Sequence, residues 1–251
     1  SQNITFVYEV KHKAMPDSEE ITSEYYYLDV LGKQSVFRSE NDRKSDSLKE
    51  STGFGSDSKP NFAQLYVLKN LINGKILRTV STPLMNDKFS LQIDEKRDWQ
   101  ILPDKKMIGE LECQKASLEY GGRNWTAWFA PSISVQEGPD VFSGLPGLII
   151  QVFDDRSDYS FDLIKTKNSN KNNMFYLRKG KIITWDDYKK IQASIYSDPL
   201  AELKARGIKF QSSDTNGNKL SMGTKDMSEG IKKSIRDNNN PLEINHKVEF
   251  N

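Results

Sequence analysis

Apolar and polar side chains alternate along most of the first two-thirds of this 251-residue chain. Ile4, Phe6 and Tyr8 begin the pattern, and a spacing of two residues places such side chains on one face of a β-strand. The strand-like segments follow one another without the intervening helices that a parallel sheet requires. This pattern predicts a large antiparallel sheet, folded as a single domain over residues 1–251.

Turn residues separate the predicted strands. Asn73-Gly74 and Gly121-Gly122 each stand between two alternating segments, and such dipeptides favour tight hairpins because their central residues readily adopt positive φ. A further hairpin is predicted around residues 156–158. We expect roughly ten strands that pair mostly with their sequence neighbours.

The final third of the chain shows helical periodicity instead. Thr184 and Asp187 have the spacing of a capping box, and apolar residues then recur at helical intervals over 185–195. A second helix is predicted over 199–206, with a proline in its first turn. Segment 184–206 is expected to cover an open side of the sheet. The predicted fold class is mainly β with C-terminal helices: a large curved antiparallel sheet, a half-barrel or open barrel, covered by two or three helices.

Two other segments are predominantly polar. Residues 39–60 contain almost nothing to bury, which predicts a mobile loop or a short exposed helix. Residues 238–251 form a polar tail, in which 242–250 is the one segment with the pattern of a last strand.

Composition excludes several classes of protein. The chain has 36 Lys and Arg against 35 Asp and Glu, so it has no global field that would hold a phosphate backbone, and we expect no nucleic-acid partner. No stretch reaches the roughly 20 apolar residues that a membrane helix needs. Cys113 is the single cysteine, which leaves neither an intramolecular disulfide nor a multi-cysteine metal cage. We predict no metal and no other cofactor.

Catalytic signatures are missing from the sequence as well. There is no G-x-S-x-G motif, and His12 and His246, the only histidines, stand at opposite ends of the chain. Cys113 lies in an alternating segment, which is typical of a buried structural thiol. We therefore predict a protein without enzymatic activity and without catalytic residues.

Aromatic residues concentrate between positions 99 and 153. Trp125 and Trp128 are an odd number of residues apart, so their rings point to opposite faces of a strand. Such rings either pack in the core or line a concavity that takes a ligand. Candidate ligand-binding residues are Trp99, Trp125, Trp128 and Phe142.

The string Gly144-Leu145-Pro146-Gly147-Leu148-Ile149 resembles the defining hexapeptide of the GLPGLI family, exported Bacteroidota proteins of unknown function. Further matching elements stand in the family's order: Ile108-Gly109, Cys113-x-Lys115-Ala116, Arg123-x-Trp125-x-Ala127-Trp128, Gly138-Pro139 and Asn240-Pro241-Leu242-Glu243. This resemblance implies a leader that ends just before a glutamine, with Gln2 as the natural mature start. It also implies export to the periplasm or cell surface.

Two looser likenesses concern shape and modification. The glycine-proline entry into an apolar strand resembles the late strands of LolA- and RseB-type half-barrels, which hold lipid or a protein segment in a concavity. Asp46-Ser47-Leu48 resembles the acceptor tripeptide of Bacteroidota O-glycosylation, which makes Ser47 a candidate site.

The hexapeptide also has a purely structural interpretation. Gly144 and Gly147 permit positive φ or close approach of backbones, and Pro146 pushes the residue before it into an extended conformation. The chain then enters a continuous apolar run at 148–152, as a central strand covered on both faces would, with helix 185–195 as the expected cover.

Three functional hypotheses follow. The first is a non-enzymatic cell-envelope protein that binds an apolar ligand, such as a lipid, or a protein partner in the periplasm or at the outer membrane. The second is an interaction scaffold accessory to an outer-membrane transporter. The third is a hydrolase, which would require Cys113 or a serine to meet His12 or His246 in a pocket.

Overall fold

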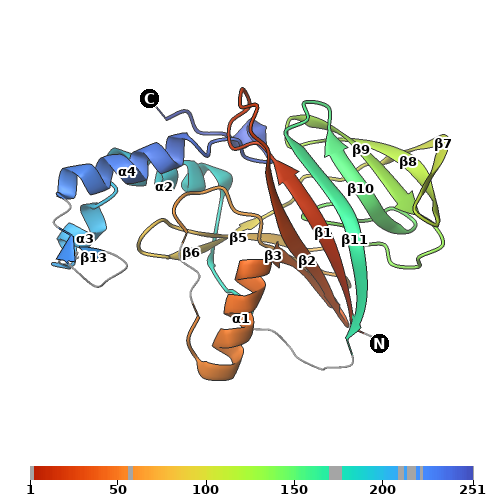
Figure 1. Ribbon diagram of the computed structural model, residues 1–251, viewed down its shortest axis with the longest axis horizontal. Helices are drawn as coiled ribbons and strands as arrows, with labels where there is room; N and C mark the ends of the chain where they lie inside the picture. Colours follow the sequence, from red (N-terminus) through yellow and green to blue (C-terminus); the bar gives the residue numbers. More distant parts are fainter. Residues whose placement is uncertain are drawn as a thin grey trace.

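The fold is described by a computed structural model over residues 3–55, 59–169, 177–208, 212–213, 219–220 and 223–250; the expected mature start, Gln2, lies outside these ranges. Within them, one 12-stranded sheet dominates (Figure 1). Its strands are β1 (Asn3–His12), β2 (Thr22–Leu31), β3 (Gln34–Ser39), β4 (Val67–Asn70), β5 (Ile76–Ser81), β6 (Lys88–Gln92), β7 (Gln100–Ile108), β8 (Leu111–Tyr120), β9 (Arg123–Ala130), β10 (Leu148–Asp154), β11 (Tyr159–Ser169) and β12 (Lys181–Ile183).

The strand order is β12-β6-β5-β4-β3-β2-β1-β11-β10-β9-β8-β7. β12 and β7 form the two edges, so the sheet is open, and β12 pairs in parallel with β6 while the other pairs are antiparallel. The predicted class, a curved antiparallel sheet with helices, is confirmed. The predicted turns are also present, because Gly74, Gly121 and Gly122 all have positive φ.

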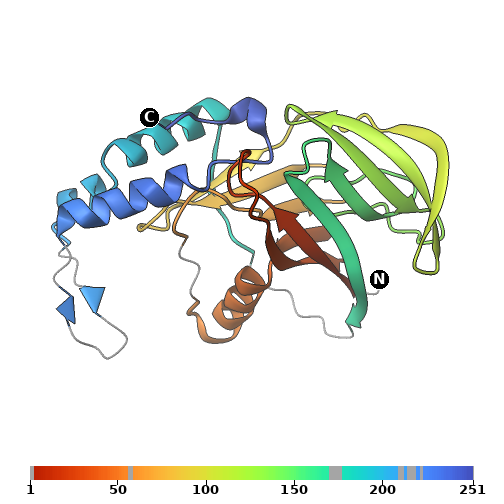
Figure 2. The ribbon, with the colours of Figure 1, turned by 45° about the horizontal axis from the view of Figure 1, so that its top comes forward.

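Helices lie at one end and on one face of the sheet. They are α1 (Glu40–Thr52), α2 (Trp185–Ser197), α3 (Ala201–Ala205) and α4 (Thr224–Arg236), with a 3₁₀ turn at Ile244–His246 and a small second sheet of β13 (Ser212–Ser213) and β14 (Lys219–Leu220). α2 and α4 run side by side at the end of the molecule away from the β7–β8 hairpin (Figure 2). The last strand expected within 242–250 is replaced by the 3₁₀ turn.

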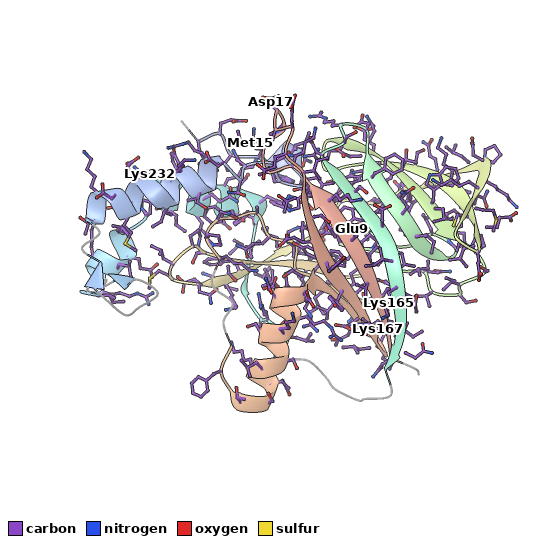
Figure 3. The ribbon with its side chains drawn as sticks, viewed as in Figure 1. Glu9, Met15, Asp17, Lys165, Lys167 and Lys232 are labelled. Carbon is purple, nitrogen blue, oxygen red and sulfur yellow. The ribbon has the colours of Figure 1, made fainter. Side chains whose placement is uncertain are left out.

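The two faces of the sheet differ in chemistry. We call the face that carries the main apolar cluster the inner face; its members include Phe6, Tyr8, Val10, Leu28, Phe37, Val67, Ile76, Val80, Leu91, Trp125, Val152 and Phe161. The opposite, outer face carries Glu9 on β1 and Lys165 and Lys167 on β11 (Figure 3). This division follows from the period-two pattern, because successive side chains of a strand point to opposite faces.

Residues 40–52 form helix α1, so of the two alternatives predicted for 39–60 the structure has the helix and not the mobile loop, although Asp42, Ser45 and Asp46 are buried in it. Ser39 caps the helix by accepting a hydrogen bond from the backbone N–H of Asp42 (3.1 Å). The helix packs on β2 and β3. Its sequence has almost no apolar residues, so composition does not indicate that three of its side chains are buried.

Buried ion pairs attach α1 to the outer face. The guanidinium of Arg38 contacts Asp29 at 3.1 Å and Asp46 of α1 at 2.7 Å. Asp46 also accepts hydrogen bonds from Tyr66 (2.9 Å) and Arg178 (2.8 Å). These side chains are all buried. Charge pairing therefore replaces the apolar stripe that usually docks a helix.

The connection between β9 and β10, residues 131–147, lies on the inner face, and we call it the inner-face loop. Two ion pairs hold it: Lys69 Nζ contacts Glu137 at 2.7 Å, and Arg78 Nη2 contacts Asp140 at 2.5 Å. The ring of Phe142 lies 4.6 Å from that of Trp125 between centroids. Much of the concavity is thus filled by the chain itself.

The hexapeptide forms the return from the inner-face loop to the sheet. Gly144 has φ +93°, and Gly147 lies so close to Ala130 that a Cβ would stand 2.3 Å from its carbonyl oxygen. β10 follows as a buried interior strand, as the sequence predicts. The cover over Ile149 comes from the inner-face loop, since Gly138 packs directly on that side chain, and not from the predicted helix 185–195.

We predict that Gly147→Ala lowers the free energy of unfolding by about 3 kcal/mol or more, because backbone must move to admit the methyl group. Gly74→Ala is the matched control: its φ is +70° but a Cβ there has open space, so strain alone should cost about 1–2 kcal/mol. Urea unfolding measures both. Equal losses in the two variants would contradict the close-approach role of Gly147.

Asp46→Asn should destabilise the fold by about 3 kcal/mol, the lower end of the range for a broken buried pair, because it removes one of the two carboxylate partners of each buried guanidinium group, Arg38 and Arg178. Lys44→Ala on the exposed side of α1 removes only a surface pair with Glu40 and should cost less than about 0.5 kcal/mol. Chemical unfolding followed by circular dichroism compares them. A loss for Asp46→Asn as small as that for Lys44→Ala would show that α1 is not held by these charges.

Candidate functional site

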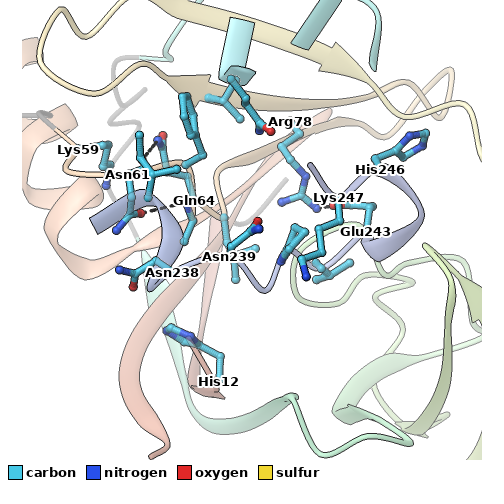
Figure 4. A pocket seen from close by; sticks show the side chains of 18 of the residues that line it. His12, Lys59, Asn61, Gln64, Arg78, Asn238, Asn239, Glu243, His246 and Lys247 are labelled. Atoms are coloured by element: carbon cyan, nitrogen blue, oxygen red, sulfur yellow. Dashed lines mark hydrogen bonds and ion pairs between the residues drawn. The ribbon is translucent and has the colours of Figure 1, made fainter. Parts of the chain in front are cut away.

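A cavity of about 350 Å³ lies between the inner face and the C-terminal elements, and we call it the helix-side cavity (Figure 4). The sheet contributes Tyr26, Arg78, Val80 and Tyr159. The segment before β4 contributes residues 59–65. The helical side contributes Trp185, Tyr188, Gln192, Ile235, Asn238 and Asn239, and the tail contributes Pro241, Leu242, Glu243, His246, Lys247, Val248 and Phe250.

Helix α2 presents one face to this cavity. Thr184 and Asp187 form the predicted capping box, which fixes where the helix begins. Trp185, Tyr188 and Gln192 then follow at intervals of three and four residues, so they lie on the same side of the helix. The predicted helix of 185–195 is confirmed, and part of its apolar face lines a cavity.

The tail is anchored by a buried arginine of β9. Arg123 donates to Asn240 Oδ1 (2.7 Å) and to the carbonyl of Leu242 (3.0 Å), and it pairs with Asp154 (2.7 Å) and Asp158 (2.6 Å). Two of the motifs noted in the sequence, Arg123-x-Trp125 and Asn240-Pro241-Leu242-Glu243, therefore meet in space. Their contact fixes the tail that closes the cavity.

Glu243 and Arg78 form a charged group at the cavity wall. Arg78 contacts Glu243 (2.7 Å) as well as Asp140 (2.5 Å), and Tyr120 donates its hydroxyl to Glu243 (2.8 Å). Burial, together with Asp140, raises the pKa of Glu243 even though Arg78 opposes the shift. Burial by itself would lower the pKa of Arg78, because it disfavours the charged guanidinium. The attraction of Asp140 and Glu243 is stronger than this effect, so the pKa of Arg78 is raised.

Each lysine or arginine that lines the cavity has a carboxylate partner. Lys59 pairs with Asp42 (2.8 Å), Lys247 pairs with Glu249 (3.2 Å), and Arg78 has the two partners just described. The lining therefore offers an anionic ligand no unpaired cation among the described residues. A neutral ligand fits this electrostatic balance better than an ion does.

Tyrosine hydroxyls supply neutral hydrogen-bond donors. Burial raises the pKa of Tyr26, Tyr159 and Tyr188, so each keeps its proton at neutral pH. Tyr159 donates to the carbonyl of Asn240 (2.5 Å). The hydroxyl of Tyr26, a side chain only 7% exposed, makes no hydrogen bond within the described residues. It is free to donate to a ligand.

Both histidines border the same cavity, although they stand at opposite ends of the sequence (Figure 4). His12 Nε2 lies 3.6 Å from Glu24, and this contact lowers the pKa of the carboxyl group. His246 stacks on Trp185 with ring centroids 4.1 Å apart and planes 3° apart. Burial and the nearby Lys189 lower the pKa of His246, so its ring is neutral at pH 7.

Two candidate nucleophiles in the described part of the chain, Ser39 and Cys113, have other surroundings than these histidines. Ser39 borders the cavity, but its hydroxyl donates to Asp42 and accepts from the same residue as the cap of α1. Cys113 is buried in β8, and burial raises the pKa of its thiol.

The aromatic residues singled out in the sequence lie elsewhere. Trp125 and Phe142 are buried in the core, and Trp99 donates its indole N–H to the carbonyl of Ser143 (3.0 Å). Trp128 points to the other face, as its odd spacing from Trp125 predicts, with Lys106 Nζ 4.3 Å from its ring centroid. Trp99, Trp125 and Phe142 gather around the inner-face loop. The helix-side cavity is lined by other aromatic rings.

The remaining sequence-based sites have the following environments. Ser47 is exposed on α1, next to the buried Asp46. Across the described part of the chain, no group of three or more His, Cys, Asp or Glu side chains is placed to hold a metal ion. The helices within those same ranges are also too short or too polar to cross a membrane.

Comparison with known proteins gives a family match and a fold match. Residues 120–151, from the end of β8 into β10, match a family described as "Protein of unknown function (Porph_ging)". Among curated proteins, none matches the chain in sequence.

Two solved structures share the fold. "Structure of PNGF-II in C2 space group" has a TM-score of 0.54 and 12% identity, and "Structure of PNGF-II in P21 space group" has 0.54 and 11%. In each case the match covers 77% of this chain and 33% of the other. This chain thus spans about a third of the PNGF-II chains it matches, and at such identities the likeness concerns the fold alone.

The stacked, partly buried His246 makes a pH-dependent contribution to stability. Because its folded-state pKa lies below the ordinary value, the folded protein binds fewer protons than the unfolded chain as the pH falls through about 6.5. This residue therefore lowers the free energy of unfolding at acid pH and has no such effect above that range. An NMR titration of the ring protons, assigned with His246→Gln, should give a midpoint below 6.5; a midpoint at or above it would contradict the burial argument.

Proposed function

We propose that this protein is a non-enzymatic binding protein whose helix-side cavity takes a neutral amphiphile. Such a ligand has an apolar ring or chain and a head rich in hydroxyl or amide groups. The proposal narrows the broader class of apolar ligands and protein segments that the sequence favours. The observation that carries it is the unpartnered hydroxyl of Tyr26, which is nearly buried in a cavity whose cations are all paired.

Desolvation explains why the head should be neutral and polar. A ligand that displaces water from the Tyr26 hydroxyl loses free energy unless it offers an oxygen or amide acceptor in place of that water. An anion would have to displace an existing carboxylate from Lys59, Arg78 or Lys247. A cation would face the guanidinium and ammonium groups of the lining, where Glu243 is already paired with Arg78 and Glu24 contacts His12.

Aromatic rings explain why the body should be apolar. Phe62 and Tyr188 meet edge to face at 6.0 Å, and Trp185 and Phe250 also line the cavity. Rings of this kind supply large contact areas at low entropic cost. The volume of about 350 Å³ lies within the range of small-ligand sites.

We further propose that the protein acts outside the cytoplasm, in the periplasm or at the cell surface. The resemblance of residues 144–149 to the GLPGLI hexapeptide supports this location. Fractionation of the native cell tests it: the protein should be recovered with the envelope, and recovery in the cytoplasmic fraction would contradict the proposal.

The ligand proposal is tested by isothermal titration with three amphiphiles that share an eight-carbon chain: octyl glucoside, octanoate and octyltrimethylammonium. Octyl glucoside, below its micelle concentration, should bind the helix-side cavity. Tyr26→Phe should weaken its binding roughly 2- to 10-fold, which corresponds to one neutral hydrogen bond.

Tyr25→Phe is the matched control, since Tyr25 is the neighbouring residue and is 51% exposed. It should leave the affinity unchanged, and Trp185→Ala should reduce it further than Tyr26→Phe does. The proposal fails if octyl glucoside does not bind, or if Tyr26→Phe and Tyr25→Phe have the same effect.

A further inference from the structure

A second cavity, of about 580 Å³, lies on the other side of the inner-face loop, and we call it the loop-side cavity. It is lined by Val30, Lys69, Asn70, Leu71, Gly74, Ile76, Arg97, Ser134, Val135, Gln136, Glu137, Ser143 and Gly144. Gly144 of the hexapeptide donates its N–H to the carbonyl of Gln136 (3.1 Å), so one wall is a closed turn of the inner-face loop. The opposite wall is the turn between β4 and β5.

The charges of this cavity are not balanced. Lys69 is neutralised by Glu137 at 2.7 Å and also donates to the carbonyl of Gly138 (2.8 Å). Arg97, in contrast, forms no ion pair with any carboxylate in the described residues. Its Nη1 donates to the carbonyl of Glu95 (3.1 Å), and the Glu95 carboxylate is itself taken by the N–H of Gly121 (3.1 Å).

Neighbouring contacts fix the position of Arg97. Two residues further on, Trp99 donates to the carbonyl of Ser143 (3.0 Å) and packs on Phe142 at 6.1 Å between centroids. The segment that carries Arg97 is therefore held against the inner-face loop. Burial lowers the pKa of Arg97 although Tyr120, Glu137 and Glu95 oppose the shift, so these groups compensate the charge of Arg97 less fully than Asp140 and Glu243 compensate that of Arg78.

We infer that the loop-side cavity binds an aliphatic carboxylate, with Arg97 as its anion receptor. Nη1 is engaged by the protein, so Nε and Nη2 remain as a parallel pair of donors on one edge of the guanidinium. That edge matches the two oxygens of a carboxylate. Val30, Leu71, Ile76 and Val135 provide the apolar surface on which the chain of the ligand packs.

The two cavities thus differ in what they select. In the helix-side cavity each cation is paired, and in the loop-side cavity one cation is left over. The same eight-carbon chain should therefore enter different sites according to its head group. This inference is independent of the proposed function of the helix-side cavity.

Isothermal titration of the full chain with octanoate and with its neutral isostere octanamide tests the inference. Octanoate should bind, and Arg97→Gln should weaken its binding about 10- to 100-fold, the range of a charge-assisted pair. Arg97→Lys should recover only part of the loss, because an ammonium group cannot bind both oxygens along one edge. Affinity should also fall as salt rises.

Arg156→Gln, on the exposed hairpin tip between β10 and β11, is the matched charge control and should leave octanoate binding unchanged. Tyr26→Phe should also leave it unchanged, which separates this site from the helix-side cavity. Thermal unfolding establishes that Arg97→Gln is folded; if it is not, Ser134→Trp, which fills the cavity from an exposed wall position, should abolish binding.

The inference would be overturned if octanoate did not bind, if octanamide bound as tightly as octanoate, or if Arg97→Gln kept the wild-type affinity for octanoate. Acetate that binds as tightly as octanoate would refute the role of the apolar wall.

Discussion

Two buried cations on the inner face of the sheet determine how this molecule is arranged. Lys69 and Arg78 lie on adjacent strands within an otherwise apolar surface, and both are nearly inaccessible to water. Charges in such a position require partners. The inner-face loop supplies them through Glu137 and Asp140, so the loop crosses the sheet at one place and leaves a cavity on each side.

The hexapeptide is a consequence of this arrangement. After crossing the sheet, the chain must turn back and enter β10 directly beside the end of β9. Gly144 provides a positive φ, and Gly147 allows its backbone to touch that of Ala130. The segment therefore connects the inner-face loop to strand β10. Its two glycines are required by a positive φ at Gly144 and by the close backbone contact at Gly147.

Local periodicity made part of this structure predictable. The interior strand after Gly147, the Gly121-Gly122 hairpin and the capped helix after Thr184 follow from patterns within about ten residues. A helix was one of two alternatives for the segment of α1, but its burial against the sheet was not predictable in this way, because its attachment depends on Asp46 meeting Arg38 of β3 and the distant Arg178. Strand β7 has no sequence signal of this kind, because it contains Pro103 and several charged residues at an edge, where the usual apolar alternation is absent.

The candidate site could not have been found from the sequence. Its residues come from both ends of the chain, with His12 near the start and His246 near the end. No sequence motif around either histidine indicates that it lines a cavity. The aromatic cluster around Trp125 drew attention instead, and it packs in the core. The two cavities differ in how their charged side chains are paired. Arg78 of the helix-side cavity has two carboxylate partners, whereas Arg97 of the loop-side cavity forms no ion pair within the described residues, and neither fact can be read from the sequence.

The central claim is that the inner-face loop divides the concavity into two sites with different charge selectivity. Amide chemical shifts of isotope-labelled protein, titrated with octyl glucoside, test it most directly because they report the location of binding. Perturbations should centre on residues 59–65, 185–192 and 238–248 and leave residues 134–137 unchanged. Perturbations on the outer face, or spread equally over both cavities, would contradict the claim.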